Sequence, residues 1–586
     1  MALTVRKRDS KSQDFSLRVG KRENEKEERF EDAFEVIPAA STMSLLSSLE
    51  ECTTGLYLFL NNRFSEALSL ISPWSKSSLY HALMYGILMV VKSALTLDPQ
   101  DIEAGSMAAK DALRTCYNFR RKSWVSFYRL VKRQGSQTIQ EEELHADVCY
   151  AESLILKAAV TFIQDDSVLG YLRSGLAISS SYQIYKDCQQ ILPQIPSSQS
   201  KTYKHLVGGI KFGVGVFNLL MSHVPPKTLK LLNVVGYSGN REVGLTLLCE
   251  SASESHINSI LSALMLLFYH GYLCVAFGMG QVSSSGAERL LVLHSQRFPH
   301  CVILKFFHAR FCMLAGDFAE AQLKLHECVF VQSEWKHVHH LCYWELMWCD
   351  IFLQNWKQAF QYARLLSQQS RWSKAIYSYS KAAILALLPA DFARLVSEDT
   401  NSLFLKVESL RIKVLGTSVP VEKFIAVKGQ RYGSTTGWYP AQPMLEFLYA
   451  WSGFRVMSKK LDLISSWLMI IDKGEDLLRE KANTEYWADD ITLLYLLKGL
   501  CLKHLGKYLM AEHYFNSVLQ REKLLKYDHY LVPYTYYELG ILYYLKGDSV
   551  SAAKSLDNVK NYRDYSMESR LQFRVHVAFE QIFKEL

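Results

Sequence analysis

The stretch YYELGILYYLKGDSVSAAK, residues 536–554, decides the fold class of this chain. Its first part carries Tyr536, Gly540 and Tyr543 at helical spacing, and Ala552 follows on a second helical segment. Small residues at such positions let two helices cross closely, while large residues fill the space between them. The stretch therefore predicts two helices joined by a turn.

Further copies of this unit recur along the sequence. Besides the stretch above, the copies lie at residues 309–321, 343–359 and 495–515, with a weaker one at 55–67. Their aromatic, small and alanine positions match the tetratricopeptide unit, which repeats every 34 residues or so. The spacing here is longer, since Ala321 to Ala359 is 38 residues and Ala511 to Ala552 is 41. The copies predict an all-α solenoid of divergent tetratricopeptide-like helix-turn-helix repeats, with HEAT-type helix pairs as an alternative.

Composition agrees with a folded, helical chain. Of the 586 residues, 49% are hydrophobic and 21% charged, which is enough apolar surface for a large core. The 66 Lys and Arg against 58 Asp and Glu give a net charge of +8, and a nucleic-acid binder more often has a strongly basic face. We therefore expect no nucleic-acid partner.

Four regions follow along the chain. Residues 1–33 hold nine basic and eight acidic side chains and few apolar ones, which predicts a charged, disordered tail. We divide the rest into an N-terminal helical repeat region (34–200), central repeats (201–390) and C-terminal tetratricopeptide-like repeats (391–586), with further breaks expected at 281–286 and 429–443.

Aligning the four good copies predicts a groove lined by the first helices. The three rows of groove positions are Ile303, Leu341, Leu493 and Tyr534; Phe306, Trp344, Leu496 and Tyr537; and Arg310, Trp348, Leu500 and Ile541. Eleven of these twelve residues are apolar or aromatic, so the groove lacks the several cationic donors that clamp a peptide carboxylate.

An apolar groove must be covered, and the sequence leaves its cover open. Another part of the chain could fill it and make a closed helical globule. An apolar helix or peptide of a partner protein could occupy it, with Trp344 and Trp348 as anchors. A lipid-like ligand is the third alternative.

Residues 223–245, HVPPKTLKLLNVVGYSGNREVGL, go beyond a generic repeat. Pro225 and Pro226 can begin a helix, and Gly239-Asn240 suits a tight turn. Together with residues 64–67 and 440–454, this stretch resembles the tetratricopeptide repeat protein 39 family over roughly residues 34–580. Ser452 departs from the Asn usual at its position in the family, which puts only a local turn in doubt.

The resemblance implies non-enzymatic adaptors, with links to lipid handling, protein turnover and ciliary function among the members. The fungal relatives are linked to the mitochondrial outer membrane and to inclusion-body clearance. The resemblance carries no catalytic residues over to this chain, and it raises the expectation of contact with a membrane or lipid droplet.

Two segments bear on that expectation. Residues 255–287 contain no Asp, Glu, Lys or Arg and are long enough to span a bilayer, although a helix apolar all round can equally be buried in a large protein. A basic cluster interleaved with aromatics is a candidate for an anionic surface, or else one solvated helix face. Its basic residues are Arg120, Arg121, Lys122, Arg129, Lys132 and Arg133.

Chemical motifs are missing from the sequence. The histidines and cysteines between His326 and Cys349 crowd together but lack the paired spacing of a structural zinc site. Gly213-x-Gly215 is followed by Asn218 where a dinucleotide fingerprint has glycine. We expect no enzymatic activity, no metal and no cofactor, and predict an intracellular, most simply cytoplasmic, protein-binding adaptor. A scaffold held at an organelle membrane by residues 255–287 and the basic 120–133 helix is the alternative.

Overall fold

The computed structural model describes residues 43–120, 141–164, 168–194, 200–225, 239–278, 284–411, 413–414, 417–418, 420–435, 438–480 and 485–584. These residues are overwhelmingly helical, which confirms the predicted all-α solenoid. The predicted tail, residues 1–33, lies outside the described part of the chain, as do residues 226–238 of the motif quoted above.

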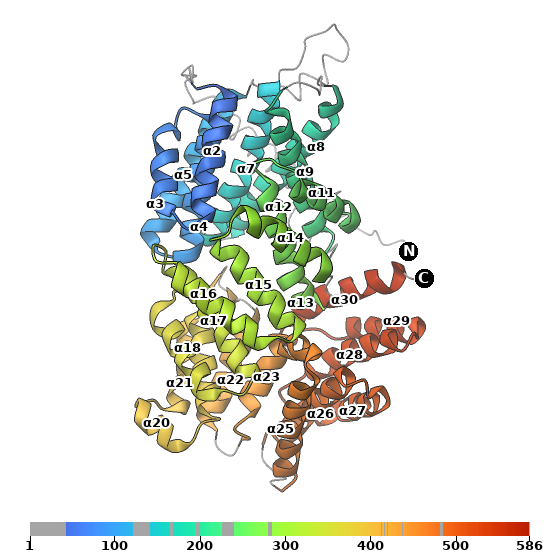
Figure 1. The fold of residues 1–586 in the computed structure, drawn as a ribbon. Coiled ribbons are helices and arrows are strands. Elements are labelled where there is room, and N and C mark those ends of the chain that lie inside the picture. Colours follow the sequence, from blue (N-terminus) through green and yellow to red (C-terminus); the bar gives the residue numbers. More distant parts are fainter. Residues whose placement is uncertain are drawn as a thin grey trace, which may run out of the picture.

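The helices follow one another in chain order from one end of the molecule to the other, and the last ones turn back to lie beside the middle (Figure 1). The first group is α2 (Leu45–Leu60), α3 (Phe64–Ile71), α4 (Leu79–Thr96), α5 (Pro99–Phe119), α7 (Glu141–Gln164), α8 (Val168–Ile191), α9 (Tyr203–Met221) and α11 (Arg241–Ser253). The middle group is α12 (Ser259–Phe268), a π-helical turn (Tyr269–Leu273), α13 (Cys274–Phe277), α14 (Ser284–Arg297), α15 (Val302–Ala315), α16 (Phe318–Val331), α17 (His337–Phe352), α18 (Trp356–Gln369) and α19 (Lys374–Leu385).

The remaining elements wind around the other end. They are α20 (Ala390–Val396), α21 (Thr400–Lys406), α22 (Pro420–Ser434), α23 (Gln442–Ala450), α24 (Gly453–Val456), α25 (Leu461–Glu480), α26 (Trp487–His504), α27 (Tyr508–Gln520), α28 (Leu531–Leu545), α29 (Ser549–Asn558) and α30 (Glu568–Lys584). Strands β1 (Lys413–Val414) and β2 (Thr417–Ser418) form one short antiparallel pair. The break predicted at 429–443 is wrong in its first part, because Gly429 lies inside α22, where its backbone closely approaches the carbonyl of Phe404.

The repeats have a common turn that the backbone geometry identifies. In every copy a residue with positive φ ends the first helix, and an alanine five positions later is fully buried where the second helix crosses it. The positive-φ residues are Asn62, Gly316, Gln354, Gly506 and Gly547, and the alanines are Ala67, Ala321, Ala359, Ala511 and Ala552. The weak copy at 55–67 is therefore a true unit, in which Asn62 adopts the backbone conformation that glycine adopts in three other repeats.

Each repeat also balances a small residue against a large one. The first position lies on the first helix, seven residues before the positive-φ residue; in chain order the repeats have Gly55, Ala309, Met347, Gly499 and Gly540 there. The second position lies on the second helix, nine residues after the positive-φ residue; the repeats have Ile71, Leu325, Ala363, Phe515 and Leu556 there. A Cβ added at Gly499 would lie 2.6 Å from the Phe515 ring, and one added at Gly540 would lie 2.8 Å from Leu556. The repeat that has the small Ala363 on its second helix has the large Met347 on its first. The two positions therefore share one volume.

Exchanging sizes across this shared volume tests the repeat packing. We expect Gly499→Ala to lower the free energy of unfolding by about 1–2 kcal/mol, because the new methyl group overlaps the Phe515 ring. The double variant Gly499→Ala/Phe515→Leu copies the Ala309/Leu325 pair, so its loss should fall about 1 kcal/mol short of the sum of the single losses. Urea unfolding of the four proteins measures this coupling. Additive losses would contradict the shared volume.

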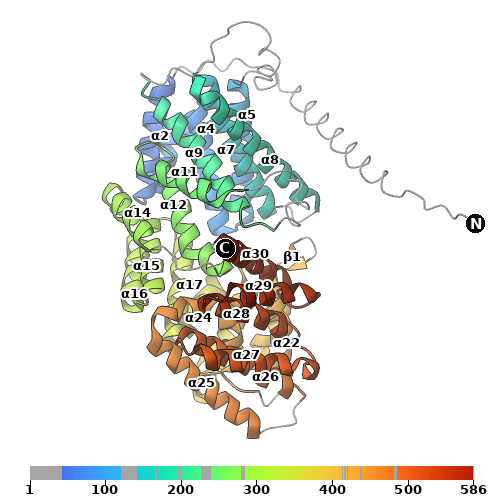
Figure 2. The ribbon, with the colours of Figure 1, turned by 90° about the vertical axis from the view of Figure 1, so that its right-hand side faces the viewer.

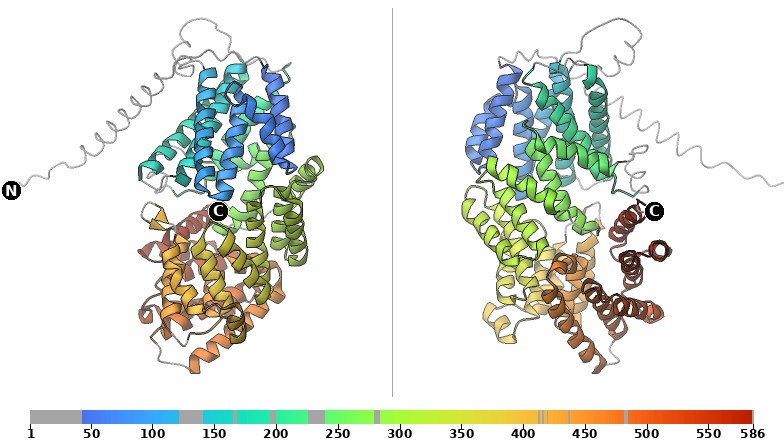
Figure 3. Two further views of the ribbon diagram at one scale, coloured as in Figure 1. Left: turned by 90° about the vertical axis from the view of Figure 1, so that its left-hand side faces the viewer. Right: turned by 45° about the vertical axis from the view of Figure 1, so that its right-hand side comes forward.

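Two large apolar clusters divide the interior, and α30 lies between them. One cluster runs mainly through α2–α15 and the other from α15 to α30. Helix α30 contributes Leu571 to the second cluster and Val577 to the first. The C-terminus accordingly lies at the middle of the molecule, between its two ends (Figures 2 and 3).

Contacts between residues far apart in the sequence fix α30 in this position. The Arg574 Nε donates to the carbonyl oxygen of Ala276 at 3.0 Å, and the rings of Phe573 and Phe277 stack 5.9 Å apart. A cation at the C-terminal end of α13 is also favoured by the helix dipole. The solenoid is therefore closed back on itself between α13 and α30.

The region boundaries predicted at residues 200 and 390 do not separate cores. A smaller apolar cluster joins Val148 and Tyr185 to Ile210, so it crosses residue 200. Likewise Tyr379 packs 5.3 Å from Phe404 across residue 390. The regions are stretches of sequence that share a continuous interior.

Candidate functional site

The structure places most of the predicted groove residues inside the molecule. Seven of the twelve are buried, four are half-buried and only Leu341 is exposed. The buried ones are Arg310, Trp348, Leu493, Leu496, Leu500, Tyr534 and Tyr537; the half-buried ones are Ile303, Phe306, Trp344 and Ile541. These rows therefore do not line an open groove. Of the three alternatives for what covers the groove, the structure shows the first, in which another part of the chain fills it.

Helix α23 fills the groove beside the two predicted anchors. The Trp348 ring stacks on Phe447 at 5.2 Å and on Trp451, just past the helix end, at 6.2 Å. Trp344 meets Trp451 edge-on at 5.1 Å and Tyr377 at 5.9 Å. Offset and edge-to-face arrangements of this kind stabilise a core beyond the area they bury. The two tryptophans are core residues of the α17–α23 contact.

Arg310, the one charged groove residue, is neutralised within the chain. Its Nη1 lies 3.1 Å from Glu345 Oε2, and its Nε donates to the carbonyl of Gly271 at 3.0 Å. Tyr272 completes the set, with its ring 4.5 Å from the guanidinium and its hydroxyl donating to Glu345. Because Gly271 and Tyr272 belong to the π-helical turn, this polar cluster joins that turn to α15 and α17.

Of the predicted basic patch, the structure describes Arg120 alone. Its Nε donates to Asp147 Oδ1 at 2.5 Å, and its guanidinium lies 4.2 Å from the Tyr150 ring. Arg120 therefore pairs with α7. Arg121, Lys122, Arg129, Lys132 and Arg133 lie outside the described residues, so an anionic surface at this cluster stays a prediction.

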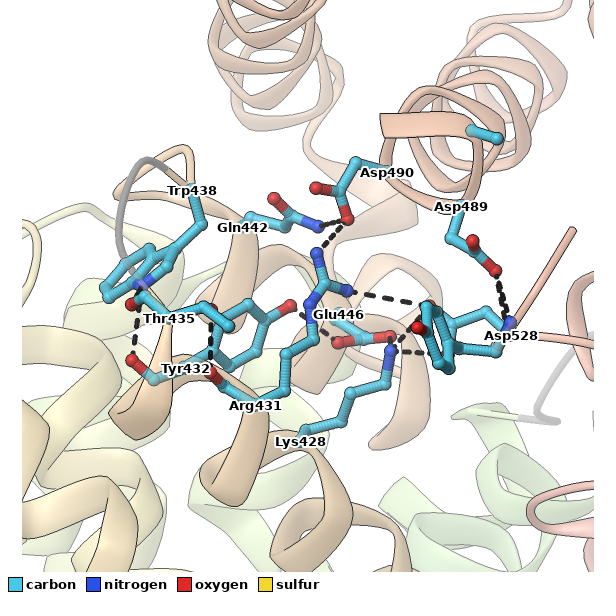
Figure 4. Close-up of polar contacts among 12 residues, drawn as sticks. Lys428, Arg431, Tyr432, Thr435, Trp438, Gln442, Glu446, Asp489, Asp490 and Asp528 are labelled. Carbon is cyan, nitrogen blue, oxygen red and sulfur yellow. Dashed lines mark hydrogen bonds and ion pairs between the residues drawn. The ribbon is translucent and has the colours of Figure 1, made fainter. Parts of the chain in front are cut away.

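A buried ionic network at the start of the C-terminal repeats was not found from the sequence (Figure 4). Lys428 on α22 lies 2.5 Å from Glu446 on α23 and 2.7 Å from Asp528, which precedes α28. Arg431, one turn along α22, pairs with Asp490 on α26. Both cations and their carboxylate partners are buried. Four segments separated by up to 100 residues are thereby held together.

Hydrogen bonds complete the network. The Glu446 carboxylate accepts from the hydroxyls of Tyr530, at 2.7 Å, and Tyr432, at 2.9 Å. Asp489, beside Asp490, accepts backbone N–H groups of the segment before α28, including that of Asp528 at 2.8 Å. Adjacent aspartates on α26 therefore hold both the preceding helix α22 and the following repeat.

Pairing opposes the effect of burial on the charged groups of the network. Burial raises the pKa of Glu446, and Lys428 opposes this rise. Burial alone would lower the pKa of Lys428, but Asp528 and Glu446 outweigh it and raise this pKa above its ordinary value. Removing one partner of a buried ion pair is strongly destabilising, because the other charge then stays buried without it. The arrangement holds helices together and presents no reactive group to solvent.

Residues with metal-binding or nucleophilic chemistry are dispersed. In the part of the chain that the structure describes, no three His, Cys, Asp or Glu side chains are grouped to hold a metal ion. All twelve cysteines are unpaired, and eleven are buried or half-buried. Burial raises the pKa of Cys274 and Cys301 to about 11, so these thiols are poor nucleophiles.

One buried carboxyl group makes stability depend on pH. Glu152 on α7 accepts from Asn258 Nδ2 at 2.8 Å, and burial raises its pKa to about 7. The unfolded chain releases this proton near the ordinary glutamate pKa, so between about pH 4.5 and 7 the folded chain binds more protons. Its contribution to stability therefore falls as pH rises through this window. Above about pH 7 Glu152 is ionised in the folded chain as well, and the folded chain then bears the full cost of burying this charge.

We expect Glu152→Gln to stabilise the protein by about 2–3 kcal/mol at pH 8 and by much less at pH 5. Melting temperatures of variant and wild type at both pH values measure the difference. Glu250→Gln, at the exposed end of an ion pair with Lys211, is the matched control and should show little effect at either pH. An equal shift for Glu152→Gln at both pH values would overturn the raised pKa.

Two described helical segments are long and apolar enough to cross a membrane by length and composition, Leu79–Thr96 and Ser259–Phe277. Within the structure, 61% and 50% of these segments is buried. The second lies within the uncharged stretch 255–287 and contains the π-helical turn. Its Tyr269 hydroxyl accepts from Arg241 Nε at 2.8 Å. Core helices of large proteins meet the same criteria.

Comparisons with known proteins cover nearly the whole chain. A family model described as Iml2/Tetratricopeptide repeat protein 39 matches residues 53–505. The chain is also 31% identical over 552 residues to tetratricopeptide repeat protein ttc-39B of Caenorhabditis elegans. That match spans 93% of this chain and 94% of the other protein.

Proposed function

Because the chain belongs to the Iml2/tetratricopeptide repeat protein 39 family, we propose that it is a non-catalytic scaffold that binds other proteins. The resemblance inferred from the sequence is thereby confirmed. Tetratricopeptide repeat proteins generally mediate protein–protein contacts and are generally non-catalytic. The proposal places partner binding on the outer faces of the repeats, since the inner faces are packed against the chain itself.

The observation that carries this proposal is the apolar character of the outward-facing second helices. On α16, Phe330 is 90% exposed and Leu323, seven residues earlier on the same face, is 53% exposed. Leu509 on α27 and Val550 on α29 occupy equivalent positions, each three residues after the positive-φ glycine of its repeat, and each is 78% exposed. Large exposed apolar side chains that share a helix face are typical of protein-binding surfaces.

Proximity labelling in cells tests the proposal with the full chain. Leu323→Asp/Phe330→Asp should remove a discrete set of labelled proteins while helicity and melting temperature stay unchanged. The control is Leu395→Asp/Leu461→Asp on α20 and α25, which adds the same two negative charges at exposed leucines of other elements. If both variants label the same proteins as wild type, α16 is not a docking face. If the set is lost equally in both, charge alone explains the loss.

A scaffold held at a membrane surface is the second candidate, and the apolar segment Ser259–Phe277 supports it. The family resemblance suggests lipid handling or protein turnover as the setting, and we propose an intracellular, most simply cytoplasmic, location from the twelve unpaired cysteines. Carbonate extraction of cell membranes separates the candidates. Release into the supernatant contradicts a spanning helix, and retention in the pellet contradicts a scaffold free of membranes.

A further inference from the structure

A small polar cavity lies where α30 closes the solenoid. Its volume is about 50 Å³, room for a few water molecules or one small ion. Residues of α13, α23, α24, α26, α28 and α30 and of the turns beside them contribute to its wall. The lining residues are Val275, Gly278, Tyr449, Ser452, Phe454, Arg455, Leu500, Lys503, His504, Tyr537, Glu538, Ile541 and Arg574.

Positive charge predominates in this wall. Arg455, Lys503 and Arg574 line the cavity against one carboxylate, that of Glu538, so the ionised lining carries a net charge of +2. Lys503 and Glu538 form an ion pair. Lys503, Glu538 and Arg574 are buried and Arg455 is half-buried, so bulk water screens these charges only weakly.

The arginines of α30 donate to uncharged acceptors. Arg574 Nη2 donates to Ser452 Oγ at 2.5 Å, and Arg570 Nη2 donates to the same oxygen at 2.9 Å. Arg574 also donates to the backbone carbonyl of Ala276, and Arg570 to that of Ala450. Two guanidinium groups therefore converge on one hydroxyl at the cavity wall. Ser452 accepts from both and keeps its own proton to donate.

Burial and the neighbouring cations lower the pKa of three groups around the cavity. Burial and the neighbouring Arg574 lower the pKa of Arg570 to about 10, and burial also lowers the pKa of Arg455. Burial, Lys503 and Arg455 hold the pKa of His504 well below its usual value, so this ring is neutral. A bound anion would reverse these three shifts. Burial alone would also lower the pKa of Arg574, but Tyr537 and its neighbours outweigh burial and raise it above its ordinary value.

We propose that this cavity binds a phosphate group, held by Arg455, Arg574 and the Ser452 hydroxyl. A phosphate carries a charge of about −1.5 to −2 at pH 7, which matches the +2 of the wall, whereas a carboxylate leaves it half neutralised. Guanidinium groups bind phosphate oxygens with two parallel hydrogen bonds. The site is independent of the outer faces on which the scaffold proposal rests.

Gly278 allows Tyr537 to reach the cavity wall. It has a φ of +73°, and a Cβ there would lie 2.2 Å from the Tyr537 hydroxyl oxygen. Only glycine allows that hydroxyl to approach the end of α13 so closely in this backbone conformation. The Tyr537 hydroxyl is thereby a further donor at the cavity wall.

Isothermal titration calorimetry of the full chain with inorganic phosphate tests the site, in chloride buffer of constant ionic strength. We expect one phosphate per chain. Arg455→Gln should weaken the Kd at least tenfold, and Ser452→Ala, which preserves every charge, should weaken it about threefold to tenfold. Lys554→Gln removes one charge from an exposed position of α29 and should leave the Kd unchanged. Circular dichroism of each variant checks that it is folded.

Further titrations identify the source of the phosphate group. If sn-glycerol 3-phosphate binds as tightly as inorganic phosphate, the group belongs to a larger ester. If only inorganic phosphate binds, the free ion is the ligand. Equal binding of acetate would overturn the choice of phosphate. The absence of saturable binding to wild type, or an equal Kd for Arg455→Gln and Lys554→Gln, would overturn the site itself.

Discussion

Replacing Glu446 by alanine is expected to lower the free energy of unfolding by about 3–5 kcal/mol, since it leaves Lys428 buried beside a single carboxylate, Asp528. The same change removes the acceptor of the Tyr530 and Tyr432 hydroxyls, two buried donors. Guanidinium chloride unfolding followed by tryptophan fluorescence measures the loss.

Glu512→Ala is the matched control for this variant. Glu512 also accepts from a tyrosine hydroxyl and a lysine, Tyr543 and Lys546, but at a part-exposed site where such a pair contributes at most about 1 kcal/mol. The double variant Lys428→Met/Glu446→Leu should recover part of the stability lost by Glu446→Ala, because it removes this ion pair and refills its volume, while Asp528 keeps Arg431 at 3.7 Å as its cationic partner. A loss for Glu446→Ala no larger than that for Glu512→Ala would show that the network is not a clamp.

Trp348→Ala should likewise cost about 3–5 kcal/mol, because it opens a cavity between Phe447, Phe352 and Trp451. Trp348→Phe should cost much less. The indole N–H of Trp348 is buried without a hydrogen-bond acceptor among the described residues, so phenylalanine removes an unsatisfied donor along with some volume. Differential scanning calorimetry of the two variants measures the contrast.

Leu341→Ala is the control for Trp348, because this groove residue is 37% exposed and should cost under about 1 kcal/mol. If Trp348→Ala left the melting temperature unchanged and instead abolished binding of a partner protein, the tryptophan would be a docking anchor. The closed groove would then be wrong.

The repeats could be predicted from the sequence because their determinants are local. A positive-φ residue and an alanine five positions on, as at Gly547 and Ala552, are set by one turn and one helix crossing. Whether the groove is open or filled by the chain could not be predicted in this way. It depends on Phe447 and Trp451, about a hundred residues from Trp348, and no periodicity within α17 reports on them.

The polar sites were missed for a related reason. Lys428, Glu446, Asp490 and Asp528 each read as an ordinary charged residue of a helix or turn, and only their distances make them a network. A weak signal exists for the cation-lined cavity. Lys503 and His504 end a run of apolar residues on α26, and a lysine in such a place must either reach water or find a partner.

The contact between α13 and α30 has a consequence for how the chain folds. An open solenoid can form from any repeat and fray from its ends, so its stability is close to a sum over neighbours. Here Arg574 contacts Ala276, which lies 298 residues earlier in the chain. The chain must lose the conformational entropy of closing this long loop before the contact can stabilise the fold. The closed array should therefore assemble more slowly than its local helix pairs suggest, and lose its two apolar clusters in one transition.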